Sequence, residues 1–234
     1  MIIPLLLILE KGEIVLGDKI IKSEIVFESY LTNDEGVYNE EKEAGLIPLS
    51  FRLYQEKYTV NGTETIEIGR ANGFVVDYES TQASPMEVAM YMDGFSDSVF
   101  IPSYRMIDYI EAVEEYLEHR FQYEDNEELI VQLSKKHGID KEDFESFYDV
   151  GFYLDYITIR DEYRSKGYGR KFLRDIEVKL HDLFGITFIS LLVDEDERKS
   201  FLNYFYNTQG YKETSGDSAK GDPDSKTTVM FKRF

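Results

Sequence analysis

A basic turn that contains two glycines is the part of this sequence whose residue types and spacing point most directly to chemistry. Gly167 and Gly169 lie where a strand-like stretch gives way to an amphipathic helical pattern. Arg164, Lys166 and Arg170 surround them. Glycines at the start of a helix allow successive backbone N–H groups to approach an anion, and the helix dipole favours negative charge there. The turn therefore predicts a cradle for a pyrophosphate.

Two common phosphate-binding motifs do not fit this turn. A dinucleotide fingerprint needs a third small residue at position 172, where the chain has Phe172, and too little sequence follows for a second nucleotide-binding half. The chain also contains no Gly-x-x-x-x-Gly-Lys-Ser/Thr, which excludes a P-loop.

From position 150 onward, the apolar pattern predicts a strand–helix–strand–helix–hairpin unit that positions the turn. The turn follows the first strand and opens the first helix, and Gly185 ends that helix. The expected elements are a strand at Phe152–Arg160, a helix at Arg170–Phe184, a strand at Ile186–Val193, a helix at Glu197–Thr208, and strands at Tyr211–Thr214 and Thr227–Phe231.

Two motifs in this unit resemble those of the GNAT superfamily of acetyl-CoA-dependent N-acetyltransferases. Arg164-Ser-Lys-Gly167-Tyr-Gly169 is similar to the family signature Arg/Gln-x-x-Gly-x-Gly/Ala. Downstream, Phe205-Tyr206-Asn-Thr-Gln-Gly210-Tyr211 is similar to the family segment Leu/Phe-Tyr-x-x-x-Gly-Phe/Tyr. Both occur in the family's order, within roughly the last eighty residues.

The resemblance implies an α+β fold with a mixed, mostly antiparallel central sheet, helices on its faces, and a splayed strand pair that holds acyl-CoA. The pantetheine arm would lie beside Tyr156–Arg160 and pair with the backbone of Ile157 and Ile159. The pyrophosphate would bind at the turn, whose residues are Arg164, Ser165, Lys166, Gly167, Tyr168, Gly169 and Arg170.

The resemblance also implies an activity and a catalytic residue. The chain would transfer an acetyl group from acetyl-CoA to a primary amine by direct attack in a ternary complex. Tyr206 occupies the position from which many members protonate the departing thiolate, and a phenol remains protonated at neutral pH. The alternative for Tyr206 is aromatic packing, because Phe201, Tyr204 and Phe205 lie in the same segment.

Two points of the resemblance stay open. The family often has an Asn seven residues before the tyrosine, where this chain has Lys199, so a non-catalytic CoA-binding sensor or interaction module remains the second hypothesis. The general base is unassigned. Its candidates are Asp155, Glu162, Asp93 and Asp97, each of which can equally be a surface carboxylate, and a well-placed water can serve instead.

The first half of the chain, about residues 1–149, matches no motif and is assigned to the acceptor side of a single domain covering residues 1–234. The pattern predicts an antiparallel meander followed by helices. Strands are expected at Ile20–Leu31, Leu49–Val60 and Thr65–Tyr78, with a hairpin turn at Asn61-Gly62, and helices at Pro85–Asp93, Tyr104–Phe121 and Glu127–His137, with a further helix starting near Asp140.

The net charge of the chain limits the classes of partner that it can bind. With 46 acidic and 26 basic residues the formal charge is −20, which opposes binding to nucleic acid or to an anionic membrane. The acidic charge can serve solubility alone. Otherwise, such a surface favours a cationic acceptor, either a small amine or a protein-borne one. A third reading is an acidic chain that binds a basic protein, although the basic stretch Arg160–Leu180 counts against it.

The remaining features point to a cytoplasmic protein without a metal. The apolar residues 1–9 lack a preceding basic residue and are followed by Glu10, so we interpret them as a buried strand rather than a targeting or membrane segment. The chain has no cysteine, and His119, His137 and His181 lack metal-ligand spacing. The oligomeric state is open, a homodimer included.

Overall fold

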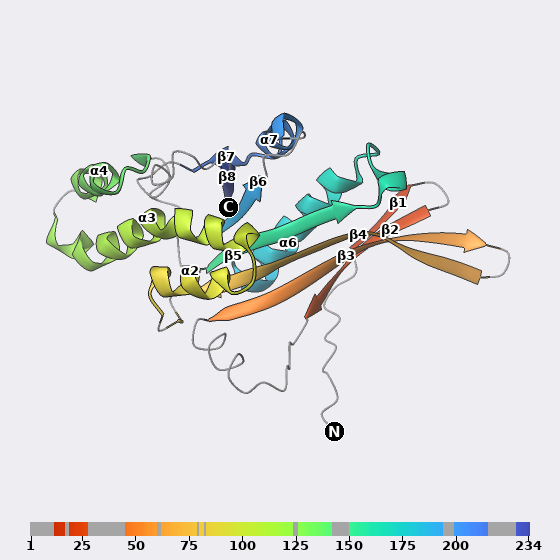
Figure 1. The fold of residues 1–234 in the computed structure, drawn as a ribbon, viewed down its shortest axis with the longest axis horizontal. Helices are drawn as coiled ribbons and strands as arrows, with labels where there is room; N and C mark the ends of the chain where they lie inside the picture. Colours follow the sequence, from red (N-terminus) through yellow and green to blue (C-terminus); the bar gives the residue numbers. More distant parts are fainter. Residues whose placement is uncertain are drawn as a thin grey trace, which may run out of the picture.

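The fold is built around one mixed sheet, seen in a computed structural model (Figure 1). The structure describes residues 12–16, 19–27, 45–59, 62–78, 80–81, 83–123, 126–141, 150–193, 199–214 and 228–234. Within these residues the sheet has eight strands in the order β1-β2-β3-β4-β5-β6-β8-β7. The strands are β1 Gly12–Leu16, β2 Lys19–Phe27, β3 Leu46–Thr59, β4 Gly62–Asp77, β5 Val150–Ile159, β6 Phe188–Val193, β7 Lys212–Glu213 and β8 Thr228–Arg233.

The strand directions divide the sheet into two parts. Strands β1 to β4 form an antiparallel meander, and β5 continues it by pairing antiparallel with β4. The pair β5 and β6 is parallel, whereas β8 is antiparallel to both β6 and β7. The expectation of an α+β fold with a mixed, mostly antiparallel sheet is thus confirmed.

Helices cover both faces of the sheet (Figure 1). On one face lie α2 Pro85–Asp93, α3 Asp97–His119 and α4 Asn126–His137, and on the other lie α6 Tyr168–Phe184 and α7 Lys199–Asn207. Two short 3-10 turns, η1 Arg120–Gln122 and η2 Asp161–Tyr163, complete the described elements. Because neighbouring residues of a strand face opposite sides, Phe152 and Leu154 join the core under α6, whereas Tyr153 joins the core under α3.

A bulge in β5 changes this alternation. Asn72 of β4 lies opposite Tyr156, but the next residue, Gly73, lies opposite Leu154, so Asp155 is the additional residue. Such an insertion locally reverses which side chains point to which face. As a result, Ile157 and Ile159 pack against the core under α6, on the same side as Leu154.

The element boundaries confirm most of the predicted pattern. The helix at Pro85–Asp93 and the strand ending near Arg160 agree with α2 and β5, and Gly185 ends α6 in the left-handed conformation. The β3–β4 hairpin is present with Thr59 opposite Gly62, so Gly62 belongs to the strand, and the turn itself lies outside the described residues. The proposed strand at residues 1–9 and most of the helix after Asp140 also lie outside them.

Two predicted helix starts were wrong. Helix α3 begins at Asp97, not at Tyr104, because Pro102 is accommodated inside the helix, where it and Val99 are buried. Helix α6 begins at Tyr168, not at Arg170, so Gly169 belongs to its first turn. No helix in the described parts of the chain is both long and apolar enough to cross a membrane.

The bulge gives a prediction about stability. A Cβ atom added at Gly73 would lie 2.4 Å from both the carbonyl oxygen of Tyr153 and Cζ of Phe152, which is too close without a shift of the backbone. Gly73→Ala should therefore lower the free energy of unfolding by about 1–3 kcal/mol, as overpacked core substitutions do. Urea denaturation measures this change.

Gly169→Ala is the matched control for that substitution. Its added Cβ would meet Ile159 Cγ1 at 3.7 Å, an ordinary contact, and the position is helical. Alanine in a helix should leave the stability unchanged or raise it by up to about 1 kcal/mol. A Gly73→Ala protein as stable as its parent would contradict the close approach at the bulge.

Candidate functional site

The site begins where β5 loses its partner on one edge. Strand β6 pairs with β5 over four residues, from Gly151 opposite Phe188 to Leu154 opposite Leu191. Strand β5 continues to Ile159, and in Figure 1 the two strands diverge beyond the paired part, with α7 following β6 and the η2 turn following β5. The edge of β5 after Leu154 has no β6 partner among the described residues.

The register on the opposite edge shows which backbone groups face this opening. Arg160 donates its N–H to the carbonyl of Ile68 at 2.9 Å, while Ile159 lies opposite Gly69. In an antiparallel ladder this pattern marks Ile159 as the member of a non-hydrogen-bonded pair, so its N–H and C=O point away from β4. Ile157, two residues earlier, points the same way. Both residues therefore present backbone groups to the open edge.

At the end of this edge, the chain turns into α6 with its backbone exposed. Ser165 has φ 59° and Gly167 has φ 82°, both in the left-handed region, which a glycine adopts without strain. Gly167 is the N-cap of α6, no side chain caps the helix, and a Cβ at Gly167 would meet nothing within 4 Å. The first N–H groups of α6 are thus open to an anion.

The basic side chains of the turn differ in the contacts that they make. Arg164 donates from Nε to the carbonyl of Ile159 at 2.9 Å and pairs with Asp161 at 2.7 Å. Lys166 donates to the carbonyl of Glu162 at 2.5 Å. These hydrogen bonds and the ion pair stabilise the turn. Through its bond to the carbonyl oxygen of Ile159, Arg164 already uses one of the hydrogen-bond acceptors on the open edge. Arg170, at the first turn of α6, is exposed.

Tyr206 lies on α7 at the other side of the opening. Its side chain is 7% exposed, and its ring contacts Phe205 and Tyr211 in edge-on geometry, with centroids 5.1 and 5.5 Å apart. Phe205 in turn lies beside the turn, because a Cβ at Gly169 would be 4.0 Å from Phe205 Cζ. Burial raises the pKa of the Tyr206 phenol to about 12, so the hydroxyl keeps its proton at neutral pH.

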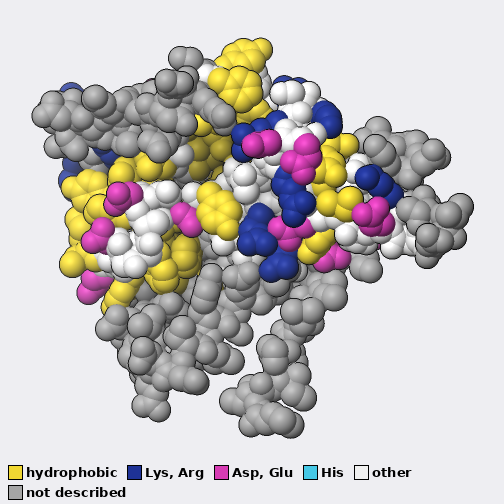
Figure 2. Space-filling model, turned by 45° about the vertical axis from the view of Figure 1, so that its right-hand side comes forward, with side chains coloured by type: hydrophobic (Ala, Val, Ile, Leu, Met, Phe, Trp, Pro, Cys, Tyr) yellow, Lys and Arg dark blue, Asp and Glu magenta, His cyan; other side chains and the backbone are white. Residues whose placement is uncertain are grey.

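A hollow of about 510 Å³ adjoins the turn on the sheet face opposite α6. Figure 2 shows the side of the molecule on which β5 ends, where Lys and Arg side chains mix with Asp and Glu side chains. Within the hollow, Arg70 pairs with Glu67 at 3.0 Å, and Arg164 pairs with Asp161. Its lining comprises Glu67, Gly69, Arg70, Tyr156, Thr158, Ile159, Arg160, Asp161, Glu162 and Arg164.

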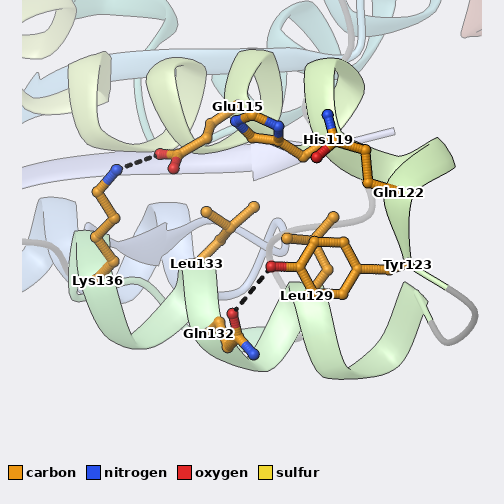
Figure 3. Close-up of a pocket in the computed structure, with 8 residues that line it drawn as sticks. All are labelled: Glu115, His119, Gln122, Tyr123, Leu129, Gln132, Leu133 and Lys136. Atoms are coloured by element: carbon orange, nitrogen blue, oxygen red, sulfur yellow. Dashed lines mark hydrogen bonds and ion pairs between the residues drawn. The ribbon is translucent and has the colours of Figure 1, made fainter.

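A second hollow, of about 280 Å³, lies between α3 and α4 (Figure 3). Its polar groups largely satisfy one another: Lys136 donates to Glu115 at 2.6 Å, and Tyr123 donates to Gln132 at 3.4 Å. Hydrogen bonds from Lys136 and His137 lower the pKa of the Glu115 carboxyl. This hollow lies away from the glycine turn, at the other end of the molecule in Figure 1, and we do not assign a function to it.

The structure brings together the residues that the two sequence motifs singled out. The open edge at Ile157 and Ile159, the turn before α6, and α7 with Tyr206 meet around Ile159, Gly169 and Phe205. Lys199 begins α7, but its side chain lies outside the described residues. Within the described parts of the chain, no three His, Cys, Asp or Glu side chains form a group that could hold a metal ion.

Among the candidate bases, Asp155 differs from the others in that its carboxylate accepts a hydrogen bond from a side chain far away in the sequence. Ser96, which sequence reasoning missed, donates from Oγ to Asp155 Oδ1 at 2.8 Å. The sequence signal for Ser96 was its place before Asp97 and an apolar stretch, which is typical of a helix N-cap. Asp93, Asp97 and Glu162 are exposed.

A comparison of the sequence with the models of known protein families and with curated proteins found no match. The geometry of the site, together with the sequence motifs, therefore carries the functional interpretation.

The burial of Tyr206 predicts how the stability depends on pH. Its pKa rises from 10.0 to about 12, so between these values the folded protein keeps a proton that the unfolded chain loses. The neutral, buried phenol therefore makes its full contribution to the free energy of unfolding below about pH 10. This contribution is lost as the pH rises towards 12, by up to ~2–3 kcal/mol at 1.36 kcal/mol per pKa unit.

Urea denaturation of the parent and Tyr206→Phe at pH 8, 10 and 11 measures this effect. Because phenylalanine does not titrate, the difference in unfolding free energy between the two proteins should shift against the parent above pH 10. A difference that stays constant over this range would contradict the burial of the phenol.

Proposed function

We propose that this chain is a GNAT-type N-acetyltransferase, which transfers the acetyl group of acetyl-CoA to a primary amine by direct attack in a ternary complex. The observation that carries the proposal is the open edge of β5, where the backbone groups of Ile157 and Ile159 point away from β4 and lead to the uncapped start of α6. An extended amide-containing arm can pair with such an edge as an added strand.

The charges of the turn support binding of the acyl donor. Its pyrophosphate would accept hydrogen bonds from the N–H groups between Ser165 and Arg170, where Gly167 leaves the approach open. The stretch Arg160–Leu180 has seven basic and four acidic residues, which leaves 19 basic and 42 acidic residues elsewhere. A polyanion is thus attracted to the turn and repelled by the rest of the chain.

Tyr206 would act as the general acid. As the amine nitrogen bonds to the thioester carbonyl carbon and the carbon–sulfur bond breaks, the sulfur gains negative charge. A phenol that remains protonated can donate to this sulfur. The position of Tyr206 next to Phe205, which adjoins the turn, supports this role.

The acceptor is expected to be cationic, either a small amine or a lysine or N-terminus in a basic context. The balance of −23 outside Arg160–Leu180 favours the encounter with a cation. Thioester cleavage with a panel of amines tests the activity. Binding of CoA without cleavage for any amine would favour the alternative, a CoA-binding sensor or interaction module.

The first prediction of the proposal concerns the turn. Gly167→Val places a branched side chain into the open space before α6, so it should block the approach of the pyrophosphate and weaken CoA binding at least tenfold by calorimetry. Gly185→Val is the matched control, because Gly185 ends the same helix with φ 64° and likewise has nothing within 4 Å of an added Cβ.

Both variants suffer a similar backbone strain, since a left-handed non-glycine residue costs about 1–2 kcal/mol. The control should therefore lose stability but keep its affinity for CoA. Equal CoA affinity in folded Gly167→Val and in the parent would refute the assignment of the turn.

The second prediction concerns Tyr206. Tyr206→Phe keeps the aromatic packing and removes the hydroxyl, so kcat should fall by roughly 10²–10⁴ while the affinity for acetyl-CoA is retained. Tyr204→Phe, on the exposed side of the same helix, is the control and should keep full activity. If kcat of Tyr206→Phe stayed within twofold of the parent, Tyr206 would be a packing residue only.

A further inference from the structure

A carboxylate stands where β5 and β6 separate. Leu154 is the last residue of β5 that pairs with β6, and Asp155, the additional residue of the bulge, follows it. Asp155 is half-buried, and α3 packs against both strands with its N-terminal end near the point at which they diverge in Figure 1. Asp155 therefore lies at the inner end of the open edge.

Ser96 holds this carboxylate in place. Its Oγ donates to Asp155 Oδ1 at 2.8 Å. Ser96 is the N-cap residue of α3, and an N-cap serine ordinarily accepts a hydrogen bond from a backbone N–H of the first helical turn. Here no side-chain cap bond is formed. The serine thus gives up a stabilising local bond and orients a carboxylate 59 residues away in sequence.

The other carboxylate oxygen of Asp155 has no hydrogen bond to any of the described residues. A carboxylate accepts hydrogen bonds at both oxygens. One oxygen is therefore fixed by the protein, and the other can accept a hydrogen bond from an ammonium group or take its proton.

The position of Asp155 also fits the length of the open edge. The four residue-to-residue steps from Asp155 to Ile159 span roughly 13 Å at 3.3 Å per step. An acyl donor whose pyrophosphate binds at the turn and whose arm follows Ile159 and Ile157 would bring its reactive end towards Asp155. Glu162, by contrast, lies at the pyrophosphate end of the edge, within η2.

We propose that Asp155 binds the acceptor as an ammonium ion and accepts the proton that the nitrogen must lose, and that Ser96 is the residue that positions it. This inference rests on the proposed acetyltransferase function and adds the acceptor side to it. The acceptors are accordingly alkylamines that are protonated at neutral pH, whereas aromatic amines, which are neutral there, lack the charge that Asp155 recognises.

The transfer balances in protons and electrons. The ammonium gives one proton to Asp155, and the free nitrogen pair forms the carbon–nitrogen bond while the carbon–sulfur bond breaks. The sulfur receives the proton of Tyr206, and the nitrogen sheds its second proton, which restores the phenol through solvent. Asp155 releases its proton to water, so the products are the amide, CoA thiol and one proton.

The test compares two pairs of variants for kcat and KM of an alkylamine and for CoA affinity by calorimetry. Asp155→Asn keeps the oxygen that accepts from Ser96 but loses the charge. It should lower kcat by roughly 10²–10³ and raise the KM for the amine, with unchanged CoA affinity. Glu111→Gln removes an exposed carboxylate of α3 that has no part in the proposed site, and it should leave all three values within twofold.

Ser96 provides the second pair, which also serves if Asp155→Asn does not fold. Ser96→Ala should lower kcat/KM for the amine about tenfold with unchanged CoA affinity, and Ser96→Thr, which retains the hydroxyl, should restore it. A role of Ser96 in helix stability alone would change the urea midpoint and leave kcat/KM unaffected.

The outcomes separate the inference from the proposed function. If the parent acetylates amines and both Asp155→Asn and Ser96→Ala keep parental kcat and KM, Asp155 has no part in the reaction while the acetyltransferase assignment stands. If the parent binds CoA but acetylates no amine, or does not bind it, the proposed function fails and the role of Asp155 fails with it.

Discussion

The unequal pairing of strand β5 is the constraint on which the other features of the site depend. One edge of β5 pairs with β4 from Val150 to Ile159, whereas the other edge pairs with β6 only as far as Leu154. Backbone N–H and C=O groups need partners, so an edge left open inside a sheet is costly unless something else meets it. Arg164 meets one of these groups, the carbonyl of Ile159, and the remainder can receive an extended ligand. The same separation of the two strands makes room for Asp155 at one end and for the turn at the other.

The core on the α6 face borders this opening, because Ile157, Ile159 and Phe205 pack against it. Glu177 of α6 pairs with Lys232 of β8 at 2.6 Å, and the ammonium of Lys232 lies 5.7 Å from the centre of the Tyr211 ring. The Tyr211 ring packs edge-on against Tyr206. Burial, followed by the nearby Glu177 carboxylate, raises the pKa of the Tyr211 phenol well above its usual range. Through the ring of Tyr211, which follows α7 in the chain, this part-buried ion pair connects α6 and β8 with the ring of Tyr206.

The distribution of charge and the geometry of the sheet act in the same direction. Under the proposed function, the excess of acidic residues elsewhere in the chain would repel a polyanionic donor, whereas the first N–H groups of α6 and the basic residues of the turn would attract it. The arm of the donor would then follow the open edge of β5. A cationic acceptor would be attracted by the acidic residues, so the two reactants would approach the same point from differently charged parts of the molecule.

The sequence by itself determined most of the elements and the residues of the turn. Alternating and helical apolar patterns, together with Gly185 and the hairpin signal, placed β3 to β6, α2, α4 and α6 within a few residues, because these patterns reflect local backbone preference and burial. The spacing of Gly167 and Gly169 after a strand indicated an exposed helix start for the same local reason. The early start of α3 at Asp97 was missed because Pro102 ordinarily marks a helix boundary, and only packing against the sheet compensates for it.

The tertiary structure alone decided which residues meet at the candidate site. Nothing in the residues around Asp155 indicates a bulge, since a bulge depends on the register with β4 and on the space beside Gly73. The end of the β5–β6 pairing at Leu154, the hydrogen bond between Ser96 and Asp155, and the contact of Phe205 with the turn all join segments that are far apart in the sequence. Such contacts arise from the packing of whole elements, whereas sequence patterns report mainly the conformation and burial of each element separately.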